Sequence, residues 1–432
     1  MTNDIVISGM GAVTPIGATV ESFWQANLEG KSGLAFETQM DLSDLPCGWV
    51  TGTVPDAIKE SIAQRWGAPG ASMGDLLMRD AVEQALADAQ IKELTGRRAG
   101  LIWVKSCPNA GSSPKEYEVF IEHQAERYRA AGDDPEAMFQ YIRAQRSSAD
   151  ISCDFPTEIS RRLHSPLLAM RLEATCAGGL RAIAEAARLL RLGKVEVVVV
   201  AAGVIRRNHY VLSQYGQLMA LSRWKGPAAQ ASTPFDKRRS GMVISEGAGA
   251  LVIETAEHAR SRGVNEVFAV LGGWGLAVDT RHVTAPSLEM IERVMRTALG
   301  ESALKPADVD TINAHGTSTR LNDLTEARAL HKVFGKTMAA LDVCAVKSLT
   351  GHCSGASGIT ETIVAALTLC RGIVPPVVTC TEPDPECNVR TYLTAVRRPI
   401  GTVIKNSFGF GGQYASMILK RPLNPRLNPT QT

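Results

Sequence analysis

Three separate segments of the chain each place reactive side chains among glycine and other small residues. The segments are residues 174–179, 313–319 and 346–352, and their reactive side chains are Cys176, His315, Lys347 and His352. A thiol attacks carbonyl carbons as its thiolate, and a histidine can transfer a proton or stabilise developing negative charge. One cysteine with two histidines is therefore equipped to attack a thioester and then to promote decarboxylation of a second substrate.

Cys176 occupies a turn between a predicted strand and a predicted helix. Residues 167–172 form a strand candidate, and residues 177–192, rich in Ala, Leu and Arg, favour a helix that ends at Gly193 before a further strand. The positive end of a helix lowers the pKa of a neighbouring thiol. A free cysteine is also commonly an inert buried residue, and the two histidine segments favour the catalytic interpretation.

The two histidines also follow predicted strands. His315 comes after the strand candidate 309–312, and His352 lies in a glycine-bounded turn. Either one alone would be interpreted as a hydrogen-bonded core residue, but three reactive side chains at strand ends indicate one edge of an α/β sheet, where such folds bind ligands. Lys347 lies in an uncharged turn, so we expect it to be partly buried against a carboxylate, for which Glu361 is available; a surface lysine is the alternative.

Residues 406–412, Asn-Ser-Phe-Gly-Phe-Gly-Gly, form a second flexible turn beside a predicted strand. An aromatic side chain flanked by glycines predicts either a swinging gate at Phe408 or a backbone N–H directed at an oxyanion. The alternative for Phe408 is an ordinary aromatic core residue.

Composition limits the function classes. The 432 residues are 45% hydrophobic and 21% charged, which is ordinary for a globular protein, and a net charge of +2 without a dense basic block argues against nucleic-acid binding. The nine cysteines show no CxxC pair, so we expect no metal site and a reducing compartment. The N-terminus lacks a signal-peptide pattern and the longest apolar run is too short to span a bilayer, so we expect a cytoplasmic protein without membrane insertion.

The chain alternates predicted strands and helices. A strand at 5–11, an amphipathic helix at 76–89 and a strand at 100–104 favour a mainly parallel sheet with helices on both faces. Residues 352–378 repeat the order of small residues, helix, Arg-Gly and strand (here 373–378) found around Cys176, which favours two related βαβ halves. We expect the halves to be residues 1–258, with the nucleophilic cysteine, and 259–432, with both histidines.

Residues 112–148 differ from the rest in composition, because charged residues alternate with five aromatic ones. We interpret this excursion as two helices broken near residues 132–135. Its aromatic side must cover another surface, either the active-site mouth or a partner subunit, and we favour the subunit interface.

The motifs together resemble the β-ketoacyl-acyl carrier protein synthases, specifically the elongating type with a Cys-His-His set. The resemblance runs nearly end to end, through residues 9–17 (GMGAVTPIG), 234–237 (PFDK), 246–249 (EGAG), 315–317 (HGT), 347–348 (KS), 351–352 (GH) and 406–412. It implies a thiolase-type, five-layered α-β-α-β-α fold and a dimer with a tunnel for the pantetheine arm of an acyl carrier protein.

The resemblance also implies roles for individual residues. Cys176 would take the acyl chain from its carrier, and His315 and His352 would decarboxylate the malonyl unit and stabilise the enolate oxygen. Lys347 and Glu361 would form a pair that holds His352. Backbone N–H groups of Cys176 and Phe408 would form the oxyanion hole, with Phe408 as the gate, while Thr317 and Thr319 would bind pantetheine. Neither a metal nor an organic cofactor is required, because decarboxylation generates the carbanion.

The chain departs from the family pattern around the acyl pocket and the entrance. Beside the cysteine, Thr175 stands where the family usually has Ala, and Gly178 stands where it usually has Ser or Thr. Arg320 and Asn322 replace a common Pro and Gly, and Gln413-Tyr414 replace Thr-Asn. Residues 105–109 are not the expected glycine-rich loop. A specialised polyketide or unusual acyl pathway is thus as well favoured as fatty-acid synthesis.

A thiolase would need a second cysteine near residue 410, and an initiating synthase would need Asn at position 352. We expect a homodimer, and the active half of a heterodimer with a catalytically silent chain-length partner stays open.

Overall fold

The computed structural model describes residues 4–67, 71–104, 126, 155–205 and 207–426. The expectations for the entrance loop at 105–109 and, apart from residue 126, for the excursion at 112–148 therefore lie outside the described residues.

One ten-stranded sheet is built from two five-stranded halves. Their strands lie side by side in the order β5-β4-β6-β7-β1 in the first half and β8-β14-β13-β9-β10 in the second. The halves join where residues 5–7 of β1 pair with residues 269–271 of β8. The strands of the first half are β1 (Ile5–Val13), β4 (Ala99–Val104), β5 (Leu167–Leu172), β6 (Val197–Val204) and β7 (Gly247–Thr255). Those of the second are β8 (Ala269–Val278), β9 (Thr311–Asn313), β10 (Asp342–Cys344), β13 (Thr402–Gly409) and β14 (Gln413–Lys420).

The two halves have the same topology. When the strands of each half are counted in chain order, the spatial sequence is third, second, fourth, fifth and first in both. The pairing directions also agree: in both halves the third, second and fourth strands run parallel to one another, the fifth is antiparallel to the fourth, and the first is antiparallel to the fifth. A shared strand order over ten strands is the arrangement that two related halves would have. The boundary at residue 258 stays a prediction.

The expected mainly parallel sheet is wrong, because the sheet is mixed. The pairs β1–β7, β6–β7, β13–β14, β8–β14 and β1–β8 are antiparallel. In the second half the fourth strand turns back directly through residues 410–412, where Gly411 and Gly412 have φ of 76° and 68°. Such a tight connection can only join antiparallel neighbours. The expected strand at 373–378 is also shorter, because only β11 (Ile373–Val374) pairs, with β12 (Val396–Arg397).

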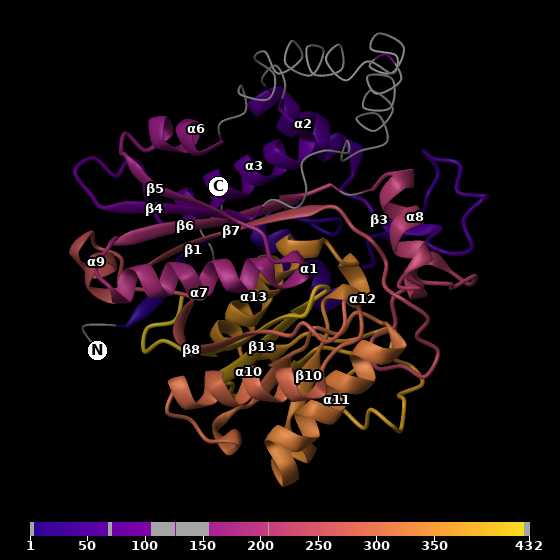
Figure 1. Ribbon diagram of the computed structural model, residues 1–432. Helices are drawn as coiled ribbons and strands as arrows, with labels where there is room; N and C mark the ends of the chain where they lie inside the picture. The colour runs from indigo at the N-terminus through magenta and orange to yellow at the C-terminus, as the bar shows by residue number, and fades with distance from the viewer. Residues whose placement is uncertain (1–3, 68–70, 105–125, 127–154, 206, 427–432) are drawn as a thin grey trace.

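Helices separate and cover the two halves of the sheet in five layers (Figure 1). Helix α3 (Met73–Asp88), with α2 (Asp56–Trp66) outside it, covers β1, β6 and β7. Helices α7 (Gly178–Arg191) and α13 (Ser354–Arg371) lie between the halves, and α10 (Leu288–Glu301) with α11 (Arg320–Phe334) covers the other face of the second half. The other α-helices within the described ranges are α1 (Val20–Glu29), α6 (Phe155–Arg162), α8 (His209–Gln217), α9 (Ala256–Ser261) and α12 (Lys347–Thr350), and the other strands there are β2 (Leu34–Phe36) and β3 (Val50–Gly52).

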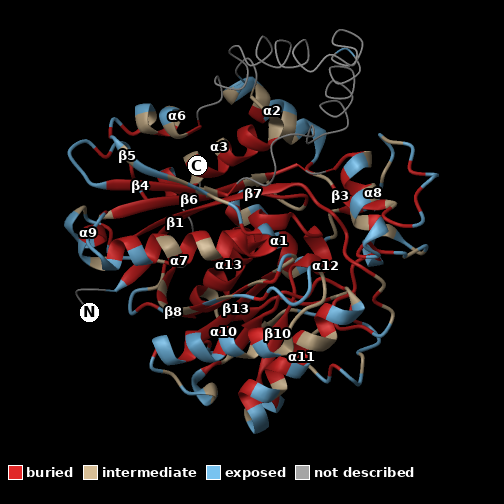
Figure 2. Cartoon of the chain, in the orientation of Figure 1, coloured by how far each residue is buried: buried red, intermediate tan, exposed pale blue. Residues whose placement is uncertain are grey.

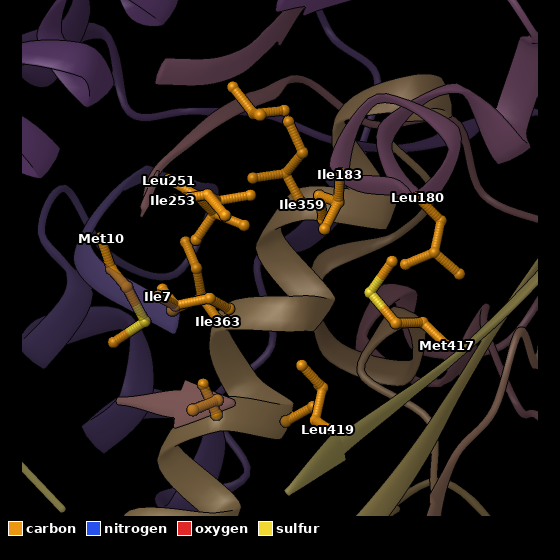
Figure 3. Close-up of a cluster of buried hydrophobic side chains, with 14 of the residues drawn as sticks. Ile7, Met10, Leu180, Ile183, Leu251, Ile253, Ile359, Ile363, Met417 and Leu419 are labelled. Carbon is orange, nitrogen blue, oxygen red and sulfur yellow. The ribbon is translucent and has the colours of Figure 1, made fainter. Parts of the chain in front are cut away.

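The central layer contains a helix, α13, that is almost completely buried. Every residue of α13 except the last is buried, whereas α10 and α11 alternate between buried and exposed faces (Figure 2). Ile359 and Ile363 of α13 pack with Leu180 and Ile183 of α7 among side chains from β1, β7 and β14 (Figure 3). No helix within the described ranges is both long and apolar enough to cross a bilayer. Protein surrounds α13 on all sides, which is why most of its 18 residues are small or apolar.

Glycines set the distance between the two central helices. A Cβ atom on Gly179 of α7 would lie 2.5 Å from the carbonyl oxygen of Gly355, 2.9 Å from the backbone nitrogen of Ile359 and 3.0 Å from Cα of Gly358, all in α13. These contacts are to backbone atoms, which cannot rotate away. Hydrogen is therefore the only substituent that this crossing accepts.

We predict that Gly179→Ala destabilises the protein by about 1–3 kcal/mol, because the helices must separate to admit the methyl group. Gly300→Ala is the matched control: it lies in α10 with nothing within 4 Å of its Cβ position, so it should be neutral or stabilise by up to about 1 kcal/mol. Urea unfolding of both variants checks the difference. Equal unfolding midpoints for Gly179→Ala and wild type would contradict the close-crossing argument.

Candidate active site

The nucleophile turn connects β5 to α7. Thr175–Ala177 form one 3₁₀ turn, and Thr175 adopts a φ of 46°, which is uncommon for a residue other than glycine. Cys176 therefore lies directly before the N-terminus of α7, as the sequence predicts. Strand β13 and the turn that follows it hold this segment in place. Thr175 Oγ1 donates to the carbonyl of Phe410 in the turn (3.0 Å), and Ser407 Oγ of β13 donates to the carbonyl of Cys176 (2.9 Å).

A buried carboxylate and a buried ammonium fix His315. The backbone N–H groups of His315 and Gly316 donate to Glu326 of α11 at 2.8 and 2.9 Å. The Lys347 ammonium donates to the His315 carbonyl (2.7 Å) and to Glu361 (2.6 Å), and it lies 3.4 Å from His315 Nδ1. An ammonium can only donate, so Nδ1 faces it as an acceptor and the ring proton is on Nε2.

His315 is held neutral. Burial, together with the charges of Lys347, His352 and Lys405, lowers the pKa of His315 well below its ordinary value. The neutral ring with a proton on Nε2 is a hydrogen-bond donor on its free side. Such a donor stabilises an oxygen that becomes negative during a reaction.

His352 lies across from His315 and has a different support. The two ring centroids are 5.6 Å apart in an edge-to-face arrangement. His352 Nδ1 is 3.0 Å from Ser357 Oγ, which also accepts the backbone N–H of Cys353 at 3.1 Å. Lys347 and Glu361 were expected to hold His352, whereas their ion pair contacts His315. Ser357, one turn into α13, is the residue that sequence reasoning missed here.

A second buried lysine is the other residue that the sequence analysis missed. Lys405 of β13 is fully buried, lies 2.7 Å from Glu361 and donates to the carbonyl of Asn406. Glu361 therefore bridges two ammonium groups, Lys347 and Lys405. Burial lowers the pKa of Lys405, and Glu361 partly offsets that effect. The signal in the sequence was a single lysine inside the apolar strand that leads to residue 406.

The two phenylalanines of the glycine-rich turn have different environments. Phe408 is buried within β13, and its ring lies 5.4 Å from that of His315 and 5.7 Å from that of Tyr414. Phe410 lies in the turn itself, and its ring is 6.1 Å from that of Tyr215 in α8. The gating and oxyanion roles of Phe408 stay predictions, and Phe410 occupies the more exposed position of the two.

A cavity of about 450 Å³ brings most of the sequence-predicted residues together. Its wall contains Cys176, His315, His352, Phe408, Thr317 and Thr319. The two threonine hydroxyls are 3.0 Å apart. Lys347 and Glu361 lie behind the wall rather than on it, so the structure separates the groups that face a substrate from those that support them.

The mouth of this cavity is apolar and positively charged. Leu218, Met219, Val283 and Leu321 are exposed at its edge, with the exposed Arg223 and Arg320 beside them. No carboxylate is among the described residues that line the cavity. Within the described ranges, His, Cys, Asp and Glu side chains do not gather in threes as metal ligands would.

We predict that Glu361→Gln destabilises the protein by about 3–5 kcal/mol, because it leaves two buried ammonium groups without a carboxylate. Lys405→Met is the control: it keeps the Lys347–Glu361 pair and replaces the second lysine with an apolar side chain of similar length, so its cost should be clearly smaller. Thermal unfolding of both variants at one pH checks the order. A Glu361→Gln protein as stable as Lys405→Met would show that the bridge does not balance these charges.

Known proteins resemble this chain over nearly its full length. Residues 2–259 match the model of the β-ketoacyl synthase N-terminal domain, and residues 268–381 match that of the β-ketoacyl synthase C-terminal domain. The 3-oxoacyl-[acyl-carrier-protein] synthase 2 of Synechocystis sp. is 30% identical, and that of Staphylococcus aureus strain COL is 31% identical. Each comparison covers 96% of this chain and 98% of the relative.

Solved ketosynthase structures have the same fold. The structure of a type II polyketide synthase acyl carrier protein in complex with its hexaketide-bound ketosynthase superposes with a TM-score of 0.82 at 25% identity. The ishigamide ketosynthase/chain length factor gives 0.82 at 28% identity. Both comparisons cover 98% of this chain and 100% of the other. The chain therefore has the thiolase-type fold and belongs to the β-ketoacyl synthase family of condensing acyltransferases.

Proposed function

We propose that this protein is a 3-oxoacyl-[acyl-carrier-protein] synthase that joins a Cys176-bound acyl chain to a malonyl group. The observation that carries the proposal is that a single cavity wall contains Cys176, His315 and His352. The names of the relatives support the same reaction. The pathway, whether fatty-acid or polyketide synthesis, is left open by these residues.

Loading is a thioester exchange at Cys176. The Cys176 sulfur attacks the acyl carbonyl carbon, the bond from that carbon to the carrier sulfur breaks, and the proton of Cys176 ends on the carrier thiol. The position of Cys176 before α7 supports attack as the thiolate. The backbone N–H groups of Cys176 and Phe408 are the donors that we propose for the developing oxyanion.

Condensation follows when a malonyl thioester enters the same cavity. The bond from the malonyl methylene carbon to its carboxylate breaks and releases carbon dioxide, and the electron pair remains as an enolate. Nε2–H of His315 and the ring of His352 stabilise the enolate oxygen. The methylene carbon then attacks the acyl carbonyl, the bond to Cys176 breaks, and the 3-oxoacyl product remains on the carrier. Thr317 and Thr319 hold the pantetheine arm.

The cavity mouth supports an acyl carrier protein as the partner. Two arginines without a competing carboxylate on the described wall suit an acidic carrier and the phosphate of its prosthetic arm. The exposed apolar side chains beside them suit an apolar patch on that carrier.

Two assemblies are compatible with the site. We propose a homodimer first, because β5 is the edge strand of the described sheet and exposes Leu168. The active subunit of a heterodimer is the second candidate, since one relative is described as a ketosynthase/chain length factor.

We predict that Cys176→Ala abolishes acyl loading and leaves the fold intact, because it removes the nucleophile and only one buried sulfur atom. Cys370→Ala is the control, since burial raises the pKa of that thiol to about 12 and keeps it unreactive. Intact mass measurement after incubation with acyl carrier thioesters checks both variants. Wild-type acylation of Cys176→Ala would refute the assignment.

We predict that His315→Ala and His352→Ala lose condensation more completely than loading. Removal of a group that stabilises the enolate should lower the condensation rate by about 10²–10⁴-fold. Release of carbon dioxide from malonyl carrier protein and the mass of loaded Cys176 separate the two steps. If either variant decarboxylates malonyl carrier protein as fast as wild type, that histidine does not have this role.

A further inference from the structure

A second, much smaller cavity adjoins the nucleophile. It measures about 10 Å³, close to the space of one water molecule. Its lining includes Cys176 and His352 together with the apolar side chains of Val204, Met242 and Ile244. Because Cys176 lines both cavities, an acyl chain bound to its sulfur can extend from the larger cavity into this smaller one. The lining therefore bears on which acyl chains can be loaded.

The lining includes a buried hydroxyl that has no hydrogen-bond partner among the described residues. Ser354, the first residue of α13, is 9% exposed, and its buried Oγ makes no hydrogen bond to any residue that the structure describes. Ser245 lines the same cavity, but its hydroxyl already donates to the carbonyl of Glu246 at 2.9 Å. A buried hydroxyl without a partner is unfavourable. The Ser354 hydroxyl is thus a donor available to whatever enters the cavity.

The position of the Ser354 hydroxyl determines which carbon of a bound acyl chain it can contact. The acyl carbonyl oxygen belongs with the oxyanion donors at the start of α7. A chain that extends from the Cys176 sulfur into the smaller cavity would place its second and third carbons beside the lining that includes Ser354. A saturated chain would bury the Ser354 hydroxyl against methylene groups, whereas an oxygen on the third carbon would accept its proton.

We propose that Ser354 is a specificity-determining residue that favours acyl chains with an oxygen on the third carbon, such as 3-oxoacyl chains, over saturated chains. This inference rests on the proposed function and names its substrate class. In the loading step the bond from the acyl carbonyl carbon to the carrier sulfur breaks and the bond to Cys176 forms, while the oxygen on the third carbon is unchanged. Because condensation itself creates a 3-oxo group, the enzyme would accept chains that no reductase has processed.

The test compares butanoyl and 3-oxobutanoyl carrier proteins, which have the same chain length and differ by one oxygen. The rate of loading on Cys176 is measured for each by intact mass. Because the 3-oxo group also changes the intrinsic reactivity of the thioester, the ratio of the two rates is compared between wild type and Ser354→Ala. We expect the ratio to fall about tenfold in Ser354→Ala, within the range that one unpaired buried hydroxyl costs.

Two further variants make the result specific. Ser354→Gly also removes the hydroxyl and suits the φ of 48° at this position, so it should fold and show the same fall in the ratio. Ser245→Ala removes the hydroxyl that is already paired and should keep the wild-type ratio. An unchanged ratio in both Ser354 variants overturns the inference while the proposed function stands. If wild type loads neither chain, the proposed function fails and the inference fails with it.

Discussion

The crossing of α7 and α13 at glycines is the constraint on which the site depends. Gly179 contacts the backbone of α13 directly, so the first turns of the two helices meet at one point between the halves of the sheet. Cys176 immediately precedes one helix and His352 lies just before the other. At neither N-terminus does the N-cap side chain make a capping hydrogen bond.

Buried charged side chains are the second feature on which the site depends. Glu361 contacts two ammonium groups, Lys347 and Lys405, and Glu326 accepts the backbone N–H groups of His315 and Gly316, so four buried ionisable groups lie behind the cavity wall. Burial and the nearby positive charges keep His315 neutral, and the Lys347 ammonium beside Nδ1 leaves the ring proton on Nε2. A site that must stabilise an enolate oxygen benefits from a nearby fixed cation and from a donor that does not need to lose a proton.

Local patterns in the sequence were sufficient to predict the elements that position the reactive side chains. The strand at 167–172 and the turn that holds Cys176 follow from short-range propensities, and six of the predicted residues line one cavity. The direction of strand pairing could not be predicted, because partners such as β1 and β7 are more than two hundred residues apart. Lys405, Ser357 and Ser354 were missed for a similar reason: each acquires its role only from residues that the fold brings beside it.

The shared topology of the halves has a consequence for how the chemistry is divided. Helices α7 and α13 follow the third strand of their respective halves, so their starting points are equivalent places in a repeated plan. In the proposed reaction one of these places supplies the sulfur that forms and breaks a covalent bond, and the other supplies an imidazole that donates or shares hydrogen. Equivalent places in two halves of one plan thus hold different reactive groups. The proposed reaction would need both halves of the chain, because each contributes its own group to the same cavity.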